Sequence, residues 1–569
     1  MTKSVQLADR VTRVKPSFTL EMTSKAAELR AQGVNIVNFS VGEPDFNTPE
    51  NIRNAAKEAM DAGFTKYTSG AGMIDLREAI CKKLNRENHL EYTPDQILVS
   101  NGEKQSLYLA CQVLFQEGDQ VIIFSPYWVS FPEFVTLSEA EPIIIGTNPD
   151  KQFEPNFDEL ESKAFALVDA HEQLMDQQSI VLYAGTNVIN PKAAKMLSSS
   201  IGNRASLGYP GAKYNKGMEH ADQLEIMLMS LMRKLFDAKY VEYRVPSGSI
   251  ANLYAYMATT KPGDKIMAFS DSAAGHVTHH AEGAAGLYGL EIHEVPFDFA
   301  NMDVDPEALM IEAKKVRPKL IIVAGSMCLF PYSLGEVRKV ADEVGAWILY
   351  DAAHMGGLIA GGEFQQPLKE GADLMTGSTY KSFGGPPSGM ILSNSAELAE
   401  RLDKIAFPGL TANFDLSRAA AMVIAVLDLL THGKEYAKMC IANAKALAES
   451  LHSGGCEVFE VSGKGFTNSQ HVAVPAAAYG GGDTAAKLLE KANLLTSGIG
   501  LPLPSVPGDF NAMRLGTQEI TRWGMRPEDM ETVADFFCRV LVQKESPEKL
   551  KSEVIEFRKE YQKLHYIRA

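Results

Sequence analysis

Apolar residues along the chain fall into short β-branched runs that alternate with helical patterns, and this alternation predicts α/β domains. In the first 160 residues, helical patterns over 17–33 and 49–63 precede the strand-like runs QILVS, DQVIIFS and EPIIIGT. A second stretch begins near Ala164 and contains KIMAFS, LEIHEVPF, KLIIVAGS, WILYDAAH and GMILS. Such continuously apolar runs are typical of strands buried on both faces, as in a parallel or mixed sheet.

The pattern changes at about Leu410, where long helices replace the alternation. A helical run over 416–455 leads into a smaller α+β region, which ends in a charged helix expected over 547–569. We therefore expect three parts, at 1–160, at 165–410 (a large α/β domain) and at 411–569 (a small C-terminal α+β domain). The segment 148–172 is the candidate boundary after the first part.

Composition limits the class of protein. The 569 residues are too many for one hydrophobic core, and a net charge of −16 argues against nucleic acid or an anionic membrane as partner. We find neither the apolar core of a signal peptide nor a window near the roughly 18 apolar residues of a membrane span. The six cysteines are scattered without a CxxC pair, so we expect reduced thiols, no metal site and a cytoplasmic protein.

One lysine lies in a setting that suits covalent chemistry. In GADLMTGSTYKSFGGPPSGMILS, Lys381 stands between a strand-like approach and a Gly/Pro-rich turn. Small neighbours and restricted solvent would let its amine lose a proton, which a lysine that forms a Schiff base requires. The alternative is a solvated surface lysine after a strand.

A carboxylate ends an apolar strand upstream of this lysine. In WILYDAAH, Asp351 is costly to bury without a cationic partner, and a protonated pyridine nitrogen is such a partner. His354 is placed to support Asp351 or a cofactor oxygen. A strand-capping aspartate and a packed histidine are the alternatives.

Three further motifs carry candidate binding residues. Ser247, Gly248 and Ser249 form a small-residue turn before a helix, whose N-terminus offers N–H groups to a phosphate; on its own the turn is only an N-cap. His276, in SDSAAGHVTHH, is placed to lay its ring on a cofactor. Arg514, in NAMRLGTQEITRW, suits a bidentate clamp on a substrate carboxylate, the alternative being a surface arginine.

The order of these motifs resembles the serine hydroxymethyltransferase family over about residues 170–569. The likeness rests on NRASLGYPGAKYNKG, VPSGSIAN, HVTHH, YDAAHMGGLIAGG, STYKSFGGP, the FPG at 407–409 and RLGTQEITRWG. It implies pyridoxal 5′-phosphate as cofactor and fold type I, with a large seven-stranded, mainly parallel α/β domain and a small C-terminal α+β domain. It also implies a homodimer or homotetramer with active sites at the subunit interface.

The resemblance also implies a role for each candidate residue. Lys381 would bear the cofactor and Asp351 would pair with its pyridine nitrogen, and both would act in catalysis with His276 and His354. The cofactor would be held by Ser247, Gly248 and Ser249 at the phosphate, His276 on the ring, His354 at the phenolic oxygen, Ser326 and Ser378 nearby, and Gly409 from a neighbouring subunit. The substrate would be bound by Arg514, Tyr214 and Tyr380.

The residues expected to serve the substrate and folate depart from the family pattern. Leu207 replaces the carboxylate that precedes the GYPG turn, and a leucine cannot transfer a proton. Ala205 and Asn215 replace two expected tyrosines, Tyr380 replaces a histidine, and the segment 386–388 lacks an expected arginine.

We therefore expect a folate-independent aldolase or transaldolase that makes or breaks the Cα–Cβ bond of a β-hydroxy-α-amino acid, with an aldehyde as second reactant. Folate-dependent hydroxymethyl transfer, on serine and glycine or on α-methylserine, is one alternative, and transamination is another. His354, Tyr380 or a water are the candidates for the base that takes the β-hydroxyl proton.

The first 160 residues resemble a different branch of the same fold type, the class I aspartate aminotransferases. The likeness is carried by RVKPSFTLEMTSKAAELRAQGVNIVNFSVGEPDFNTP, FTKYTSGAGMIDLREAI, LVSNGEKQSLYLA and SPYWVSFPEF. It implies that 102–104 lie at a phosphate, that Trp128 stacks on a ring and that Tyr67 reaches a partner's site. The aspartate, lysine and arginine that would follow are absent, so we expect a segment for assembly. The alternative is a segment that shapes the Lys381 pocket.

Overall fold

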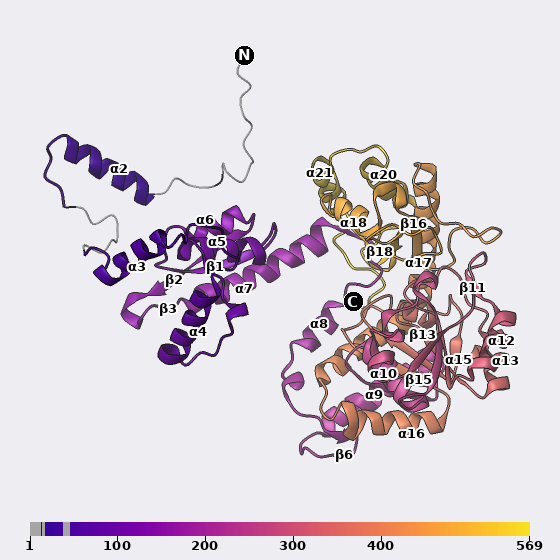
Figure 1. Ribbon diagram of the computed structural model, residues 1–569. Coiled ribbons are helices and arrows are strands. Elements are labelled where there is room, and N and C mark those ends of the chain that lie inside the picture. Colours follow the sequence, from indigo (N-terminus) through magenta and orange to yellow (C-terminus); the bar gives the residue numbers. More distant parts are fainter. Residues whose placement is uncertain (1–12, 14–17, 38–45) are drawn as a thin grey trace. The chain divides into compact units, whose positions relative to one another are not determined.

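The computed structural model describes residue 13 and the ranges 18–37 and 46–569. Residue contacts divide the chain into two compact units, Met1–Asp169 and Ala170–Ala569. The division falls inside helix α7 (Phe157–Glu172), whereas the sequence places the end of the first part at 160. Figure 1 labels many of the elements of both units, and each unit is described by itself.

The first unit is a small, open α/β layer. Its elements besides α7 are α2 (Phe18–Ala31), α3 (Glu50–Asp61), α4 (Ile74–Asn88), α5 (Glu103–Leu114), β1 (Gln120–Ser125), α6 (Phe131–Leu137), β2 (Glu141–Asn148) and β3 (Glu154–Pro155). Strands β1 and β2 pair in parallel, and Ile123, Val135 and Ala140 form a small buried core. On the other face of β1, Ile122 and Phe124 are exposed. The predicted strand QILVS is wrong, because residues 97–100 belong to no sheet among the described residues.

A seven-stranded sheet forms the centre of the second unit, as the sequence predicts. Its strands are β7 (Tyr240–Val245), β8 (Lys265–Ala268), β9 (Glu291–Glu294), β12 (Leu320–Val323), β13 (Trp347–Asp351), β14 (Leu374–Ser378) and β15 (Gly389–Ser393). Their order is β7-β15-β14-β13-β12-β8-β9. Only β15 runs antiparallel to its neighbours, so the sheet is mainly parallel.

Both faces of this sheet are buried, which explains the continuous apolar runs. In β12, Leu320 and Ile322 face one core and Ile321 and Val323 face the other, because side chains alternate along a strand. Helices cover the two faces of the sheet (Figure 1). They are α9 (Glu219–Phe236), α10 (Gly248–Thr259), α11 (Ala284–Leu287), α12 (Pro306–Val316), α13 (Leu334–Val344), α14 (Gly356–Ala360), α15 (Pro367–Glu370) and α16 (Ala396–Lys404).

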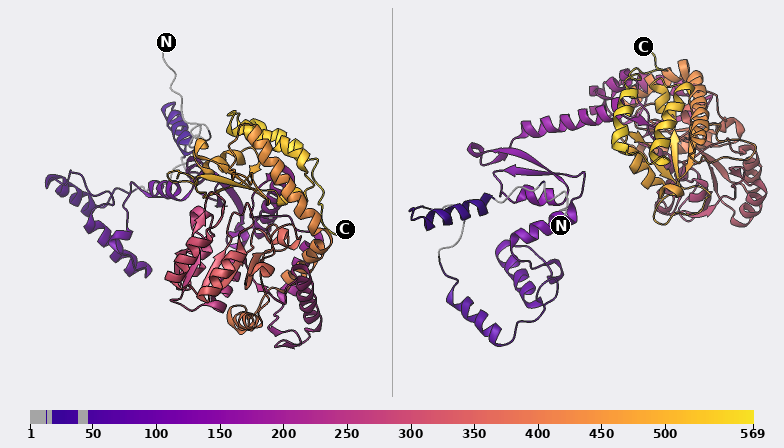
Figure 2. Two further views of the ribbon diagram at one scale, coloured as in Figure 1. Left: turned by 90° about the vertical axis from the view of Figure 1, so that its right-hand side faces the viewer. Right: turned by 90° about the horizontal axis from the view of Figure 1, so that it is seen from above.

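The C-terminal part of the second unit has its own hydrophobic core and its own sheet. Strands β16 (His471–Pro475), β19 (Ala512–Gly516) and β18 (Ser497–Ile499) form an antiparallel sheet. The helices are α17 (Leu416–Ser453), α18 (Gly482–Glu490), α19 (Gln518–Arg522), α20 (Met530–Leu541) and α21 (Pro547–Arg558). In both views of Figure 2 the yellow C-terminal helices gather on one side of the second unit.

Short elements at the start of the second unit join its two parts. Strand β4 (Ile180–Val181) pairs with β17 (Leu494–Leu495) of the C-terminal part, and α8 (Pro191–Leu197) packs against α17. Hairpin strands β5 (Gly208–Tyr209) and β6 (Ala212–Lys213) carry the GYPG turn. A second hairpin is formed by β10 (Phe297–Asp298) and β11 (Asp303–Val304).

Helix α17 contributes to both cores of this unit. Its first half lines the core beside the large sheet, and its second half lines the C-terminal core. Among the described residues, α17 is the helix long and apolar enough to span a membrane by length and composition, but 67% of its apolar window is buried inside the protein. A core helix accounts for this apolar run.

The expected charged helix at the C-terminus is shorter than predicted. Helix α21 ends at Arg558, and the residues after it form an irregular tail. Tertiary hydrogen bonds hold this tail: the N–H of His565 donates to the C=O of Arg522 at 2.7 Å, and the N–H of Arg568 donates to Asp428 at 2.7 Å. These contacts with the protein replace the helical bonds that the charge pattern predicts.

Helix α14 packs so closely against the loop after Lys381 that only a glycine fits at position 357. A Cβ on Gly357 would lie 2.1 Å from the backbone oxygen of Ser382, so Gly357→Ala should destabilise the fold by about 3 kcal/mol. Gly335→Ala in α13 is the matched control, because its Cβ would meet nothing within 4 Å. It should stay within about 1 kcal/mol of wild type. Urea unfolding measures both variants, and equal stabilities would contradict the proposed fit of α14.

Candidate active site

The candidate residues of the large domain lie where strands of the sheet end. Asp351 is the last residue of β13, Lys381 follows β14, and Ser247 follows β7. These three strands run in the same direction, so their carboxyl ends meet at one edge of the sheet. Ligand sites of parallel α/β sheets form at this edge.

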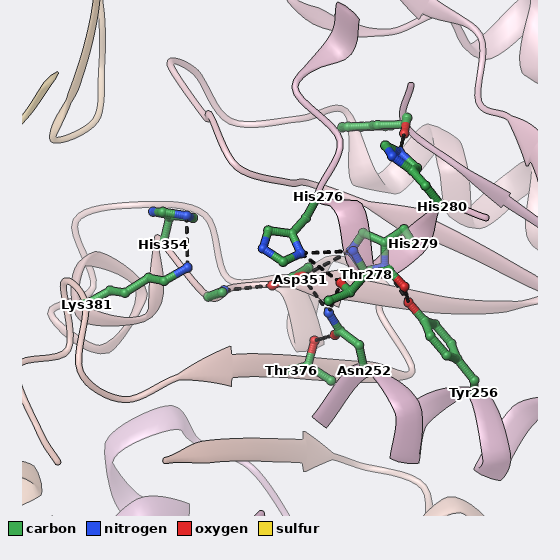
Figure 3. Close-up of polar contacts among 12 residues, drawn as sticks. Asn252, Tyr256, His276, Thr278, His279, His280, Asp351, His354, Thr376 and Lys381 are labelled. Atoms are coloured by element: carbon green, nitrogen blue, oxygen red, sulfur yellow. Dashed lines mark hydrogen bonds and ion pairs between the residues drawn. The ribbon is translucent and has the colours of Figure 1, made fainter. Parts of the chain in front are cut away.

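A network of donors holds the buried carboxylate of Asp351 (Figure 3). Its Oδ2 accepts hydrogen bonds from His279 Nε2 at 3.0 Å and from Asn252 Nδ2 at 2.9 Å, and its Oδ1 accepts one from the N–H of Ala353 at 2.9 Å. Burial by itself raises the pKa of Asp351, but the hydrogen bonds and charge of His279 outweigh it and hold the pKa well below the ordinary value. Asp351 is therefore ionised, and its Oδ1 retains lone-pair capacity for one more donor.

Each donor in this network is itself oriented. Thr376 on β14 donates to Asn252 Oδ1 at 2.7 Å, which directs the amide N–H groups of Asn252 toward Asp351. The hydroxyl of Tyr256 lies 2.5 Å from His279 Nδ1. His279 and Tyr256 are both completely buried, so water does not compete for these bonds.

Lys381 lies beside a neutral histidine. Its Nζ is 3.0 Å from His354 Nε2, while His354 Nδ1 donates to the C=O of Ala184 at 3.2 Å (Figure 3 shows the contact with Lys381). Burial, followed by the charges of Lys381 and Arg514, lowers the pKa of His354 well below its ordinary value. Burial likewise lowers the pKa of Lys381 to about 8, so its amine loses its proton more readily than that of an ordinary lysine.

Arg514 reaches the same place from the C-terminal sheet. It extends from β19, donates from Nη1 to the C=O of Ser326 at 2.5 Å, and has Nη1 3.4 Å from His354 Nε2. Burial lowers its pKa to about 10, which leaves the guanidinium charged at neutral pH. No carboxylate pairs with Arg514 in the described part of the chain, and its buried Nε has no hydrogen-bond partner. A buried, uncompensated guanidinium is suited to an anionic ligand.

The turn at the start of α10 consists of the small residues Ser247, Gly248 and Ser249. Ser247 caps the helix by accepting from the N–H of Ile250 at 3.3 Å, and Ser249 remains exposed. A Cβ on Gly248 would lie 2.2 Å from Ser378 Oγ, so only glycine allows these segments to approach so closely. The free N–H groups of the first turn of α10 can bind a phosphate.

His276 and Ser326 lie beside the Asp351 network. The N–H of Thr278 donates to His276 Nδ1 at 3.2 Å, and burial lowers the pKa of His276 to about 4. His276 is therefore a neutral ring at pH 7, which suits stacking on an aromatic cofactor. Ser326 donates its N–H to the C=O of Ala274 at 2.8 Å, which joins the loops after β12 and β8.

Three predicted residues are less buried than this cluster. Tyr214 is 81% exposed and Gly409 is also exposed, so both lie outside the buried cluster around Lys381 of their own chain. Tyr380 directly precedes Lys381 and is half-buried. The structure thus brings together most of the predicted set, and leaves Tyr214 and Gly409 on the surface.

Several residues at the site were not identified from the sequence. His279, Asn252, Tyr256 and Thr376 all serve Asp351, and Asn187 donates to the backbone oxygen of Lys381 at 2.9 Å. One signal was present: His279 follows His276 by three residues in HVTHH. The others come from distant segments whose side chains carry no pattern of their own.

The fold and these side chains define a pyridoxal-phosphate enzyme of fold type I. Asp351 offers an anionic partner to a pyridine nitrogen, and Lys381 offers an amine of lowered pKa. The first turn of α10 has N–H groups that suit a phosphate, and Arg514 is a buried cation that suits an anionic group. Among the described residues, no cluster of His, Cys, Asp and Glu could hold a metal ion.

Comparisons with known proteins agree with this class. The family model described as serine hydroxymethyltransferase matches residues 158–537, and the model described as aminotransferase class I and II matches 34–191. An α-methylserine aldolase from a Ralstonia species is 46% identical over 72% of this chain and 94% of its own length. A serine hydroxymethyltransferase from Archaeoglobus fulgidus is 40% identical over 71% of this chain and 92% of its own.

A solved structure agrees as well. The L-threonine transaldolase of Pseudomonas fluorescens superimposes with a TM-score of 0.65 and 26% identity, over 72% of this chain and 96% of that one. The chain belongs to the serine hydroxymethyltransferase family. It is a pyridoxal-phosphate-dependent enzyme that makes or breaks the Cα–Cβ bond of a β-hydroxy-α-amino acid, as the sequence predicts.

The lowered pKa of Lys381 predicts how the cofactor-free protein responds to pH. The pKa is about 8 in the folded state against an ordinary 10.5, so between these values the unfolded chain binds a proton that the folded chain lacks. Stability should therefore rise by about 3 kcal/mol as pH increases through this window. Urea unfolding of wild type and Lys381→Met measures the difference, since the variant keeps every other titrating group. Parallel pH profiles for the two proteins would contradict the assignment.

Proposed function

We propose that this enzyme is a folate-independent aldolase that cleaves α-methylserine, or a similar α-substituted β-hydroxy-amino acid. With α-methylserine the products are alanine and formaldehyde. Relatives named α-methylserine aldolase, from Ralstonia and from Variovorax paradoxus, are 46% and 48% identical to this chain and support the choice of substrate. The observation that carries the absence of folate chemistry is Leu207, at the position of the family's proton-transferring carboxylate.

The replaced residues around Leu207 support one another. Asn215, which stands where a tyrosine is expected, accepts a hydrogen bond from the N–H of Leu207 at 3.2 Å, and the N–H of Tyr214 donates to the C=O of Leu207 at 3.0 Å. Asn215 therefore holds the backbone of the GYPG hairpin. Because this bond is to the backbone, the hairpin keeps it whatever side chain stands at 207, and a leucine there presents no carboxylate.

We propose the following roles for the buried cluster. When bound, pyridoxal phosphate supplies an electron sink for the electron pair left at Cα. Asp351 keeps a proton on the pyridine nitrogen, because its low pKa makes it an anion at every relevant pH. Arg514 binds the substrate carboxylate and so orients the Cα–Cβ bond. His354 is a neutral acceptor within the cluster, and we assign it the β-hydroxyl proton.

The remaining assignments concern binding. We propose that Ser247, Gly248 and Ser249 hold the phosphate at the first turn of α10, with Ser378 beside them. His276 covers the ring and Ser326 lies near the cofactor, while Tyr380 contacts the substrate. The exposed Tyr214 and Gly409 complete the site of a second subunit, which supports a homodimer or homotetramer.

A formaldehyde assay tests the proposed reaction. Wild-type holoenzyme should release formaldehyde and alanine from α-methylserine at a rate that added tetrahydrofolate does not change. A rate that depends on tetrahydrofolate, or lasting conversion of the cofactor to its amine form, would contradict the proposal.

Arg514→Lys should raise KM for α-methylserine about tenfold or more, because a lysine cannot form the bidentate bond with the substrate carboxylate. Arg539→Lys, in a network with Glu545 and Glu553, is the matched control and should leave KM unchanged.

We propose that the first unit serves assembly and has no catalytic lysine of its own. Lys104 lies 5.4 Å from the ring of Trp128, so the residues that resemble a cofactor loop are in contact with each other. Tyr67 is fully exposed. The exposed apolar face of β1 supports an assembly role, since such faces are usually covered in the functional protein.

Removal of the first unit tests this proposal. A chain that starts at Ala170 retains the whole compact second unit and should keep its cofactor. We expect a smaller oligomer by analytical ultracentrifugation, with kcat within about twofold of wild type because no reacting group is lost. An unchanged oligomer would contradict the assembly role. A large loss of kcat in an intact oligomer would instead favour the alternative, in which the segment shapes the pocket.

A further inference from the structure

Two cysteines from distant parts of the sequence meet in the C-terminal core. Cys456 follows the end of α17 and Cys538 lies in α20, and their sulfur atoms are 3.2 Å apart. Both side chains are buried, with exposed fractions of 1% and 2%. The other described cysteines have no cysteine at this distance, so this is a particular juxtaposition within the chain.

The backbone around this pair permits the close approach. The segment Gly454–Gly455 turns the chain directly after α17, and Gly455 has a φ of +91°, which favours glycine. A Cβ on Gly454 would lie 2.6 Å from Cys538 Sγ. Glycine at 454 therefore leaves space for the sulfur of Cys538 between the two helices.

A surface pocket lies beside one of the two cysteines, Cys538. It has a volume of about 730 Å³ and lies between the ends of α17 and α20, and Cys538 is part of its lining. Three exposed carboxylates line its mouth: Glu449, Glu531 and Asp535. Their negative charges repel anionic reagents such as oxidised glutathione but do not hinder a small neutral molecule.

The two thiols differ in acidity. The hydrogen bond from Cys456 stabilises the thiolate of Cys538 and lowers the pKa of Cys538. The same hydrogen bond, followed by burial, raises the pKa of Cys456. Cys538, which lines the pocket, is thus the thiol that ionises first and the stronger candidate nucleophile.

We propose that Cys456 and Cys538 form a reversible redox site, which a small neutral peroxide oxidises to a disulfide between α20 and the end of α17. The Cys538 thiolate attacks one oxygen of hydrogen peroxide, the O–O bond breaks, and a sulfenic acid and hydroxide form. Cys456 then attacks the Cys538 sulfur as it loses its proton, and the S–O bond breaks. The two hydroxides leave as water with the two thiol protons, so two electrons pass from the thiols to the peroxide.

The bond would tighten the part of the protein that carries Arg514. Cys456 and Cys538 belong to the same hydrophobic core as Met513 and Leu515, the neighbours of Arg514 on β19. A bond across 82 positions of sequence closes a long loop of the unfolded chain. We expect the oxidised protein to unfold about 5 °C higher than the reduced protein, and dithiothreitol to reverse this shift.

Peptide mapping of the full-length holoenzyme tests the site. The protein is treated in its folded state with hydrogen peroxide or, separately, with oxidised glutathione, then alkylated, digested and analysed by mass spectrometry. We expect a peptide pair joined at Cys456 and Cys538 with peroxide, and far less of it with oxidised glutathione. No joined pair, or one that forms only after unfolding, would overturn the proposal, and this result needs no variant. Equal yields with both oxidants would overturn the role of the acidic pocket.

Single substitutions assign the order of the steps. In Cys456→Ser the sulfenic acid on Cys538 cannot be resolved, so a 1,3-diketone probe should label Cys538. In Cys538→Ser neither the label nor the bond should form. Cys440→Ser is the matched control, because Cys440 is equally buried on α17 and its variant should still form the bond. Labelling of Cys456 in Cys538→Ser would overturn the assignment of Cys538 as the nucleophile.

Discussion

The ionised carboxylate of Asp351 is the constraint on which the rest of the site depends. Burying a charge is costly, and here three donors from three segments offset that cost: Asn252 on α10, His279 after β8, and the backbone of Ala353. The loop that carries His279, helix α10 and the end of β13 are therefore all hydrogen-bonded to this one carboxylate. The same bonds keep the carboxylate ionised, which is the state that a protonated pyridine requires.

The site also contains two basic side chains, which lie beside His354. Lys381 and Arg514 both approach His354, and neither is paired with a carboxylate in the described residues. Among the described residues, no carboxylate near Arg514 offsets the cost of burying its charge. The folded protein therefore carries an electrostatic cost that an anionic ligand relieves. The guanidinium of Arg514 is thus buried but still free to pair with an anionic ligand. Burial also explains why Lys381 holds its proton weakly.

Much of this could be read from the sequence, for identifiable physical reasons. Strands buried on both faces leave continuous apolar runs, so the large sheet was predictable, and residues at the ends of such strands converge on one edge, as Asp351 and Lys381 do. The donors to Asp351 were not predictable in the same way. Asn252 and Thr376 act through side-chain hydrogen bonds across segments 124 residues apart, and no periodicity marks such pairs. The tail after Arg558 was mispredicted as helix because its binding partners lie far away in the sequence.

The residues at the GYPG hairpin depart from the family pattern, while the candidate cofactor residues keep it. The Asp351 network lies deep within the sheet edge, and a change to any member leaves a buried polar group without its partner. The hairpin between Leu207 and Asn215 has a buried ion pair of its own, between Lys213 and Glu225, and Asn215 accepts a hydrogen bond from the backbone N–H of Leu207. The side chain at 207 takes part in none of these bonds, so a leucine at this position leaves them in place. In the proposed reaction, a leucine at 207 leaves the β-hydroxyl proton to another acceptor. His354, neutral and 3.0 Å from Lys381, is the acceptor to which we assign that proton.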